Sequence, residues 1–347
     1  MENSEPVSSN ASQPMKILVT GAAGFLGSHL VDFLLNQGHE VIGLDSFQTG
    51  SPRHLKHLEN NLRFKLINWN VQDELPDPPK VDQIYHLACP ASPIQYQKNH
   101  VSTLATCYRG TENMLKLAKL LNARVLLSST SEVYGDAMVS PQPETYWGNV
   151  NPFGPRSCYD EGKRVAEALC YAYKEQYAVD VRIARIFNTY GPRMSASDGR
   201  VISNFVAAAL DGQDLRITGD GTATRSFQYV SDCTRGLYAL MNSGYGQGPV
   251  NIGNDTEYHT ILKLAEIVAD VVPRVTGQSK LRSKITFHPK PVDDPVKRRP
   301  QITLAREALG WSPVVSLEEG LRETIRWHID EMIQQHVDER KALTDSK

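Results

Sequence analysis

The front half of the chain alternates short apolar runs with longer amphipathic segments. The first apolar run, residues 16–20, is rich in β-branched side chains, as expected for a buried parallel strand. After it, Leu26, Leu30 and Leu34 recur at the spacing of one helical face. Further strands are predicted at 40–45, 63–68, 81–87, 124–129 and 181–187, and long helices at 99–121 and 159–177. This alternation predicts an α/β fold with a Rossmann-like, doubly wound parallel sheet.

The pattern changes after residue 188. Loops rich in Gly, Arg and Asp at 191–200, 219–225 and 289–300 separate shorter helices at 201–210, 260–271 and 317–333. This texture predicts a smaller C-terminal lobe that caps the carboxyl edge of the sheet. We therefore expect a disordered tail at 1–14, a Rossmann domain at 15–187 to which 226–255 returns, a substrate-binding lobe from 188–225 and 256–333, and a frayed tail at 334–347.

Composition and charge narrow the class of protein. The 347 residues are 40% apolar and 22% charged, which is typical of a globular protein of one or two domains. A net charge of −2 gives no reason to expect nucleic acid as a partner, and no apolar run reaches the ~18 residues of a membrane span. The polar first fourteen residues lack the order of a signal peptide. Five scattered cysteines without ligand spacing predict free thiols, no metal site and a cytoplasmic location.

A glycine-rich turn joins the first predicted strand to the first predicted helix. Glycines there let the backbone approach a pyrophosphate, and the helix N-terminus favours its negative charge. Asp45 ends the second strand, eighteen residues after Gly27. A carboxylate at that place accepts hydrogen bonds from ribose hydroxyls and repels a 2′-phosphate, which favours NAD over NADP. The predicted cofactor-binding residues of this turn and strand are Gly21, Gly24, Phe25, Leu26, Gly27 and Asp45.

Tyr159 and Lys163 provide the main candidate chemistry. A spacing of four places both side chains on one face of a helix. A free phenol has a pKa of ~10, and a neighbouring ammonium lowers it. The pair could therefore act as a base toward a sugar or alcohol hydroxyl. Residues 129–132 carry three hydroxyls and Glu132 to the carboxyl end of another strand, where open α/β sheets bind their ligands.

Together these motifs resemble those of the extended short-chain dehydrogenases/reductases. Longer runs, spread over residues 15–330, resemble the UDP-glucuronate decarboxylase (UDP-xylose synthase) family within that group. The runs lie at 129–136, 144–152, 156–164, 182–194, 224–232 and 293–300.

The resemblance implies a closed redox cycle on UDP-glucuronate. Tyr159 would remove the proton of the sugar 4-hydroxyl while NAD accepts the C4 hydride. The 4-keto sugar would lose carbon dioxide, and return of the same hydride would give UDP-xylose. Thr130 would orient the 4-oxygen, and Lys163 would hold the nicotinamide ribose. Glu132 and Ser131 would lie near C5 and C6.

The resemblance also assigns residues to the substrate. Arg298 would pair with an anion, either the carboxylate or the diphosphate. The substrate-binding candidates are Asn188, Asn204, Arg225, Tyr229 and Arg298. Asp232 is interpreted as a helix cap or loop anchor.

Two positions depart from the family pattern. Cys107 stands where many relatives have asparagine in Thr-Asn-Val-x-Gly-Thr, and Asn70 stands where an aspartate commonly contacts the adenine side. Both departures could lower cofactor affinity, and neither removes a group from the proposed chemistry.

Three other functions remain open. A nucleotide-sugar 4,6-dehydratase needs an acid before Glu132, where Ser131 is a poor one, and a 4-epimerase typically has no carboxylate at 132. A non-catalytic NAD-binding homologue would not need an intact Tyr159 and Lys163.

Related enzymes pair the helices at 99–121 and 159–177 across a two-fold axis, so we expect a homodimer. The apolar positions of those helices are Val101, Leu104, Tyr108, Leu115, Ala118, Ala166, Leu169, Tyr173 and Tyr177.

Overall fold

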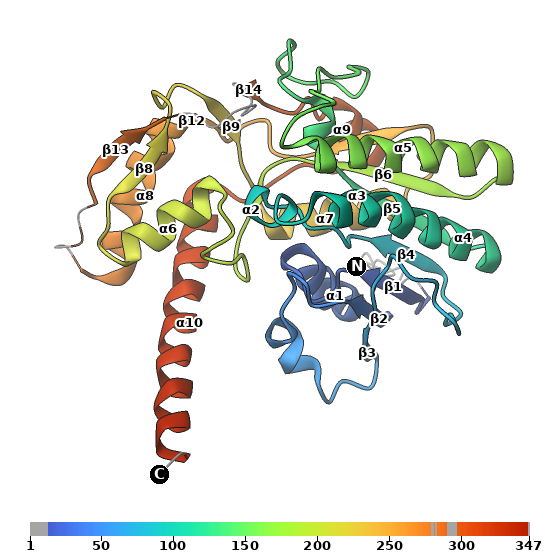
Figure 1. The fold of residues 1–347 in the computed structure, drawn as a ribbon, viewed down its shortest axis with the longest axis horizontal. Helices are drawn as coiled ribbons and strands as arrows, with labels where there is room; N and C mark the ends of the chain where they lie inside the picture. Colours follow the sequence, from blue (N-terminus) through green and yellow to red (C-terminus); the bar gives the residue numbers. More distant parts are fainter. Residues whose placement is uncertain (1–12, 279–280, 282, 290–296, 346–347) are drawn as a thin grey trace, which may run out of the picture.

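The computed structural model describes residues 13–278, 281, 283–289 and 297–345. Figure 1 shows a sheet with helices on both faces, and a smaller lobe at the left of the view. Residues 1–12 of the predicted N-terminal tail and residues 293–296 of the run at 293–300 lie outside the described residues.

Within the described residues, seven parallel strands form the central sheet in the order β11-β6-β5-β4-β1-β2-β3. Because β2 and β4 flank β1 on opposite sides, the strand order reverses between β1 and β4, which is where such sheets bind ligands. The strands are β1 (Lys16–Thr20), β2 (Glu40–Asp45), β3 (Phe64–Asn68), β4 (Gln83–His86), β5 (Arg124–Thr130), β6 (Val181–Ile186) and β11 (Pro249–Ile252).

Side chains that alternate along the strands divide the core between the two faces of the sheet. Ile17 and Val19 pack with α1 (Phe25–Asn36) and α7 (Val230–Asn242) in one buried cluster. Leu18 packs in a second cluster, against α4 (Thr111–Leu121) and α5 (Ser157–Tyr177). The predicted α/β fold with a doubly wound parallel sheet is therefore confirmed.

The helix predicted at 99–121 contains an irregular turn. α3 (His100–Ala105) leads into a π-helical turn, η2 (Thr106–Gly110), before α4 begins. Such turns are rare and often occur at functional sites. This one holds Cys107, and it lies against α5, which carries Tyr159 and Lys163.

The smaller lobe has its own apolar cluster between α6, α8 and the first turns of α10. The elements of the described residues outside the central sheet and its covering helices, in this lobe and in the connections, are η1 (Pro52–Leu58), α2 (Pro93–Tyr96), η3 (Ser131–Tyr134), β7 (Thr189–Tyr190), α6 (Val201–Leu210), β8 (Leu215–Thr218), β9 (Thr224–Ser226), β10 (Gln228–Tyr229), β12 (Tyr258–Thr260), α8 (Ile261–Thr276), β13 (Ile285–His288), β14 (Lys297–Arg298), α9 (Thr303–Leu309) and α10 (Leu317–Asp345). β13 pairs with β8, and β12, β9 and β14 form a small sheet.

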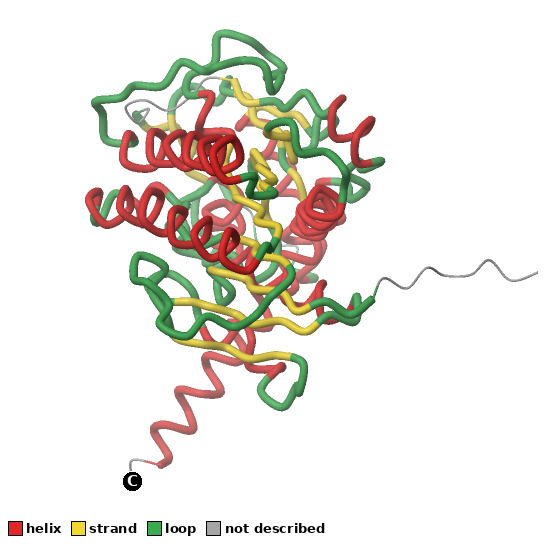
Figure 2. Tube along the Cα trace, turned by 90° about the vertical axis from the view of Figure 1, so that its right-hand side faces the viewer, coloured by secondary structure: helices red, strands yellow, loops and turns green. Residues whose placement is uncertain are grey.

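The last helix is longer than predicted. We expected a helix over 317–333 and a frayed tail from 334, whereas α10 continues to Asp345. Residues 334–345 contain neither glycine nor proline and are mostly good helix formers, so no stop signal separates them from the helix. Figures 1 and 2 both show the C-terminal half of α10 extending away from the rest of the molecule. None of the helices among the described residues combines the length and the apolar character of a membrane span.

Candidate active site

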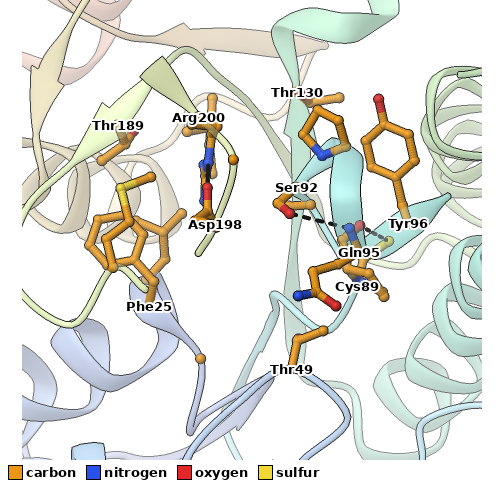
Figure 3. Close-up of a pocket in the computed structure, with 18 of the residues that line it drawn as sticks. Phe25, Thr49, Cys89, Ser92, Gln95, Tyr96, Thr130, Thr189, Asp198 and Arg200 are labelled. Carbon is orange, nitrogen blue, oxygen red and sulfur yellow. Dashed lines mark hydrogen bonds and ion pairs between the residues drawn. The ribbon is translucent and has the colours of Figure 1, made fainter. Parts of the chain in front are cut away.

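A cavity of about 570 Å³ opens at the carboxyl ends of the sheet strands, facing the smaller lobe. Its size suits a small-molecule ligand. Figure 3 shows Phe25, Asp198 and Arg200 facing Ser92, Gln95 and Tyr96 across it. The predicted site residues that line it are Gly21, Gly24, Phe25, Leu26, Gly27, Asp45, Thr130, Ser131, Glu132, Tyr159, Lys163, Asn188, Asn204, Arg225 and Arg298.

The glycine turn is closed tightly against its surroundings. Gly21 has a φ of +69°, and a Cβ there would meet the backbone of Ala88 at 3.0 Å. A Cβ on Gly27 would lie 1.9 Å from the carbonyl oxygen of Gly21. No larger residue fits either position without moving the backbone. The turn is followed directly by α1. The first N–H groups of this helix have no partner within the helix and can bind an anion.

Asp45 lies beside this turn at the end of β2. Its two carboxylate oxygens accept hydrogen bonds from the backbone N–H groups of Ala23, at 2.9 Å, and Phe47, at 2.8 Å. Burial raises the pKa of Asp45, while these two hydrogen bonds oppose the rise. A Cβ on Gly50 would meet a carboxylate oxygen at 2.8 Å, so Gly50 leaves the room that Asp45 needs. This cradle fits a dinucleotide whose ribose carries free hydroxyls.

Tyr159 is held in the cavity wall by a second tyrosine. Its ring stacks on that of Tyr96, with centroids 4.9 Å apart and planes 3° from parallel. Burial raises the pKa of Tyr159 well above 10, and a hydrogen bond with Thr130 acts in the opposite direction. The Lys163 ammonium lies 5.9 Å from the phenol ring centroid and donates to the Ser128 carbonyl at 2.8 Å. The net shift of the phenol pKa is therefore upward in this structure, set first by burial and then by the charge of Cys89, and opposite to the lowering expected from the pair alone.

Glu132 forms ion pairs with two arginines. Its Oε2 atom accepts hydrogen bonds from Arg156 at 2.6 Å and from Arg298 at 2.8 Å. Burial alone would raise the pKa of Glu132, but Arg298 and Arg156 outweigh it and hold the pKa below its usual value. Arg298 also donates to the Asn188 side chain at 3.4 Å, which joins two predicted substrate-binding residues.

Arg156 and Asp160 complete this cluster, and sequence reasoning did not identify either. Arg156 lies 3.7 Å from Asp160, whose side chain is almost fully buried. Burial, then the charge of Glu132, raises the pKa of Asp160 to about 8. Asp160 is therefore mostly protonated at neutral pH, and the two arginines exceed the single negative charge of Glu132. Arg156 is the first residue of the run 156–164, which resembles the decarboxylase family, but nothing in the sequence indicates its contact with Glu132.

Two other assignments can be compared with the structure. Tyr229 is not among the cavity-lining residues; its ring packs edge-on against Tyr190, with centroids 5.7 Å apart, in the core of the smaller lobe. Its predicted contact with substrate therefore has no support from this geometry. Asp232 accepts hydrogen bonds from the backbone N–H groups of Val314 and Val315, at 3.0 and 2.9 Å. It anchors a loop, as interpreted from the sequence.

Known proteins of similar sequence and structure share this architecture. The family model for GDP-mannose 4,6 dehydratase matches residues 18–324. UDP-glucuronic acid decarboxylase 1 of Danio rerio is 54% identical over 317 residues, covering 91% of this chain and 73% of the relative. UDP-glucuronic acid decarboxylase 1 of Arabidopsis thaliana is 56% identical over 308 residues, covering 88% and 68%.

Two solved structures extend the comparison. The UDP-glucose 4-epimerase of Thermotoga maritima has a TM-score of 0.82 at 28% identity, covering 92% of this chain and 100% of the epimerase. The UDP-glucuronic acid 4-epimerase of Bacillus cereus, in complex with UDP-glucuronic acid and NAD, has a TM-score of 0.77 at 30% identity, covering 90% and 98%.

Proposed function

Because this chain belongs to the GDP-mannose 4,6-dehydratase family and is more than half identical to UDP-glucuronic acid decarboxylases, we propose that it decarboxylates UDP-glucuronate to UDP-xylose. It is an NAD-dependent carboxy-lyase of the extended short-chain dehydrogenase/reductase type. The observation that carries the proposal is the convergence of Arg156 and Arg298 on Glu132 beside Tyr159.

Residues of the Rossmann domain would hold the cofactor. The N–H groups at the start of α1 would bind its diphosphate, Asp45 a ribose diol, and Lys163 the ribose of the nicotinamide half. When bound, NAD would supply an acceptor for the C4 hydride and a positive charge.

Tyr159 would act as the base in the first step. Tyr159 can accept a proton only as the phenolate. Burial disfavours the phenolate, and the hydrogen bond with Thr130 favours it. Positive charge near the ring, from Lys163 and from the cofactor, would offset the cost of burial. Tyr159 would then take the 4-hydroxyl proton as C4 is oxidised.

Decarboxylation would follow from the position of the ketone. With a ketone at C4, the C6 carboxylate is β to a carbonyl, so the electron pair of the C5–C6 bond can move into an enolate as carbon dioxide leaves. Thr130 and Tyr159 would donate hydrogen bonds to the enolate oxygen. Protonation of C5 from solvent, return of the hydride to C4 and return of the Tyr159 proton to the 4-oxygen would complete the turnover, which consumes one proton and causes no net oxidation.

The charge of the cluster around Glu132 supports a sugar acid as substrate. Arg156 and Arg298 together outweigh Glu132 because Asp160 is mostly protonated. A C6 carboxylate would find a compensating positive charge there, whereas the C6 hydroxyl of a neutral hexose would leave it uncompensated. Arg225 also lines the cavity, close enough to add positive charge at Glu132, and would bind the diphosphate.

Product analysis tests the proposal. The full chain is incubated with UDP-glucuronate and NAD, and carbon dioxide and UDP-xylose are followed by mass spectrometry, with Tyr159→Phe as the control. We expect stoichiometric carbon dioxide and UDP-pentose from the wild type alone. Equal product from wild type and control would refute the proposal. Loss of water from UDP-glucose or GDP-mannose, without decarboxylation, would instead establish the dehydratase alternative.

We also propose a homodimer formed by the helices that cover one face of the sheet. Figure 1 shows α3, α4 and α5 side by side. Of the predicted apolar positions, Leu115 and Ala118 are buried in the chain's own core, while Val101 is 80% exposed and Tyr108 and Tyr177 are about half-exposed. The exposed group supports contact with a second copy. We expect a dimer mass by light scattering and a monomer mass for Val101→Asp; a monomeric wild type at micromolar concentration would refute it.

A cytoplasmic location is proposed from the cysteines. All five are free thiols in the structure, and four of them are buried. Reduced thiols persist in a reducing compartment. Fractionation of cells that express the tagged full chain tests this, with recovery in the membrane or secreted fraction as the contrary result.

A further inference from the structure

Two free cysteines meet at the wall of the cavity. The sulfur of Cys89 lies 3.4 Å from the sulfur of Cys107, although the residues are eighteen positions apart. Cys89 follows the end of β4 and lines the cavity, where Figure 3 shows it near Tyr96. Cys107 lies behind it on the π-helical turn and is 2% exposed. We propose that Cys89 and Cys107 form an oxidisable dithiol site: a hydroperoxide oxidises the two thiols to a disulfide, and this disulfide reversibly inactivates the enzyme.

The geometry favours a bond between these two sulfurs. A disulfide requires a sulfur–sulfur distance of ~2.05 Å, so the two atoms must approach by a little over ~1 Å. Rotation of the two side chains can supply much of this movement. Both sulfurs belong to short, unbranched side chains, and the other polar contact of Cys89 is a weak one with the Pro90 carbonyl at 3.4 Å.

The two thiols differ in reactivity. The hydrogen bond from Cys107, with a further contribution from Lys163, lowers the pKa of Cys89 to about 7. The same contact and burial raise the pKa of Cys107 well above its usual value. Cys89 is therefore the nucleophile, because the thiolate is the reactive form and this thiol faces the cavity. Cys107 is the resolving thiol.

The reaction balances with hydrogen peroxide as oxidant. The Cys89 thiolate attacks one peroxide oxygen, the O–O bond breaks, and a sulfenic acid and one water form. The Cys107 sulfur then attacks the Cys89 sulfur, the S–O bond breaks, and the second water leaves with the Cys107 proton. Two thiols and one peroxide thus give one disulfide and two waters, and a small dithiol such as dithiothreitol reverses the bond.

The disulfide would disturb the site through both partners. A Cβ on Gly162 would lie 3.0 Å from both Cβ and Sγ of Cys107, so this side chain packs directly on the helix backbone that precedes Lys163. Cys89 packs in turn on the buried group that contains Tyr96 and Tyr159. A displacement of ~1 Å at reacting groups can cost ~100-fold in rate. We expect oxidation to reduce activity by about tenfold or more.

The test has a mass arm and an activity arm. Full-length protein is treated with graded hydrogen peroxide, free thiols are blocked with N-ethylmaleimide, and non-reduced peptides are mapped by mass spectrometry. Activity is measured on the same samples before and after dithiothreitol. The activity arm rests on the proposed function, whereas the cross-link is read without it. Cys107→Ser removes the resolving thiol without changing a cavity-lining residue, and Cys233→Ala, in a remote core position, is the matched control.

The expected result is a Cys89–Cys107 cross-linked peptide in wild type and Cys233→Ala, with activity restored by dithiothreitol. NAD should slow its formation, because the oxidant reaches Cys89 through the cavity. Cys107→Ser should keep its starting activity and form no cross-link. It should therefore show no loss of activity through a disulfide that dithiothreitol reverses. Should that variant misfold, Cys107→Asn, which carries the residue common in relatives, takes its place. Oxidation that leaves both thiols alkylatable, or a cross-link without loss of activity, would overturn the proposal.

Discussion

Replacing Asp160 by asparagine should reveal a carboxyl that is protonated in the folded enzyme. Burial raises its pKa from 3.8 to about 8. The unfolded chain releases this proton near pH 4 and the folded chain near pH 8, so between those values the folded state binds one more proton. The free energy of unfolding therefore falls as pH rises through this window, by ~1.4 kcal/mol per pH unit at most, and levels off above about pH 8.

Asparagine cannot titrate, so the variant lacks this slope. From pH 6 to pH 8, the stability of Asp160→Asn relative to wild type should grow by ~2 kcal/mol. For a chain of this length that corresponds to a difference in Tm of ~3 °C. The assay is thermal unfolding by circular dichroism at half-unit pH steps. Glu161→Gln, which removes a neighbouring carboxylate from the same helix, controls for the change in net charge.

Parallel pH profiles for wild type and Asp160→Asn would refute this reasoning. So would a variant that is less stable than wild type at pH 8 by the same margin as at pH 6. Either result would mean that Asp160 is ionised in the folded protein. Its contact with Arg156, at 3.7 Å, would then be a stabilising ion pair, and the excess positive charge around Glu132 would disappear.

Substitutions at three further positions probe the cavity. Gly27→Ala would place a Cβ 1.9 Å from the Gly21 carbonyl, so NAD binding measured by fluorescence titration should be lost and Tm should fall. Asp45→Asn should weaken discrimination against NADP about tenfold or more, measured as the ratio of the two Kd values, since one charge repulsion is removed; an unchanged ratio would contradict the assigned role. Arg156→Met removes a charge-assisted hydrogen bond to Glu132 worth ~1.5–3 kcal/mol, so kcat should fall ~10- to 100-fold and Arg156→Lys should recover part of it; equal rates for the two variants would count against positioning.

Local patterns were enough to predict the sheet and the cofactor turn. The strand predicted at 40–45 is observed as Glu40–Asp45, because a short β-branched run bounded by turn residues has few alternatives. Gly21 and Gly27 could be identified for a similar reason: the backbone conformation and close approach there exclude side chains. Tyr159 and Lys163 share a face because a spacing of four does so on any helix.

Contacts between distant segments could not be read in this way. Glu132 and Arg298 are 166 residues apart, and their contact depends on how the smaller lobe packs against the sheet. Arg156 and Asp160 belong to the site only because η3 brings Glu132 to the start of α5. The approach of Cys89 to Cys107 likewise depends on the π-helical turn, which shifts side-chain directions within a segment that reads as one regular helix.

The position of hydrogen in the product tests the central claim most directly. The full chain is given UDP-glucuronate and NAD in deuterium oxide, and the UDP-pentose is analysed by proton NMR and mass spectrometry. The account predicts UDP-xylose with one deuterium at C5, its original hydrogen at C4, and no accumulation of NADH. Deuterium at C4, or a 4-keto pentose formed together with one NADH per carbon dioxide, would contradict a closed cycle in which the same hydride leaves and returns.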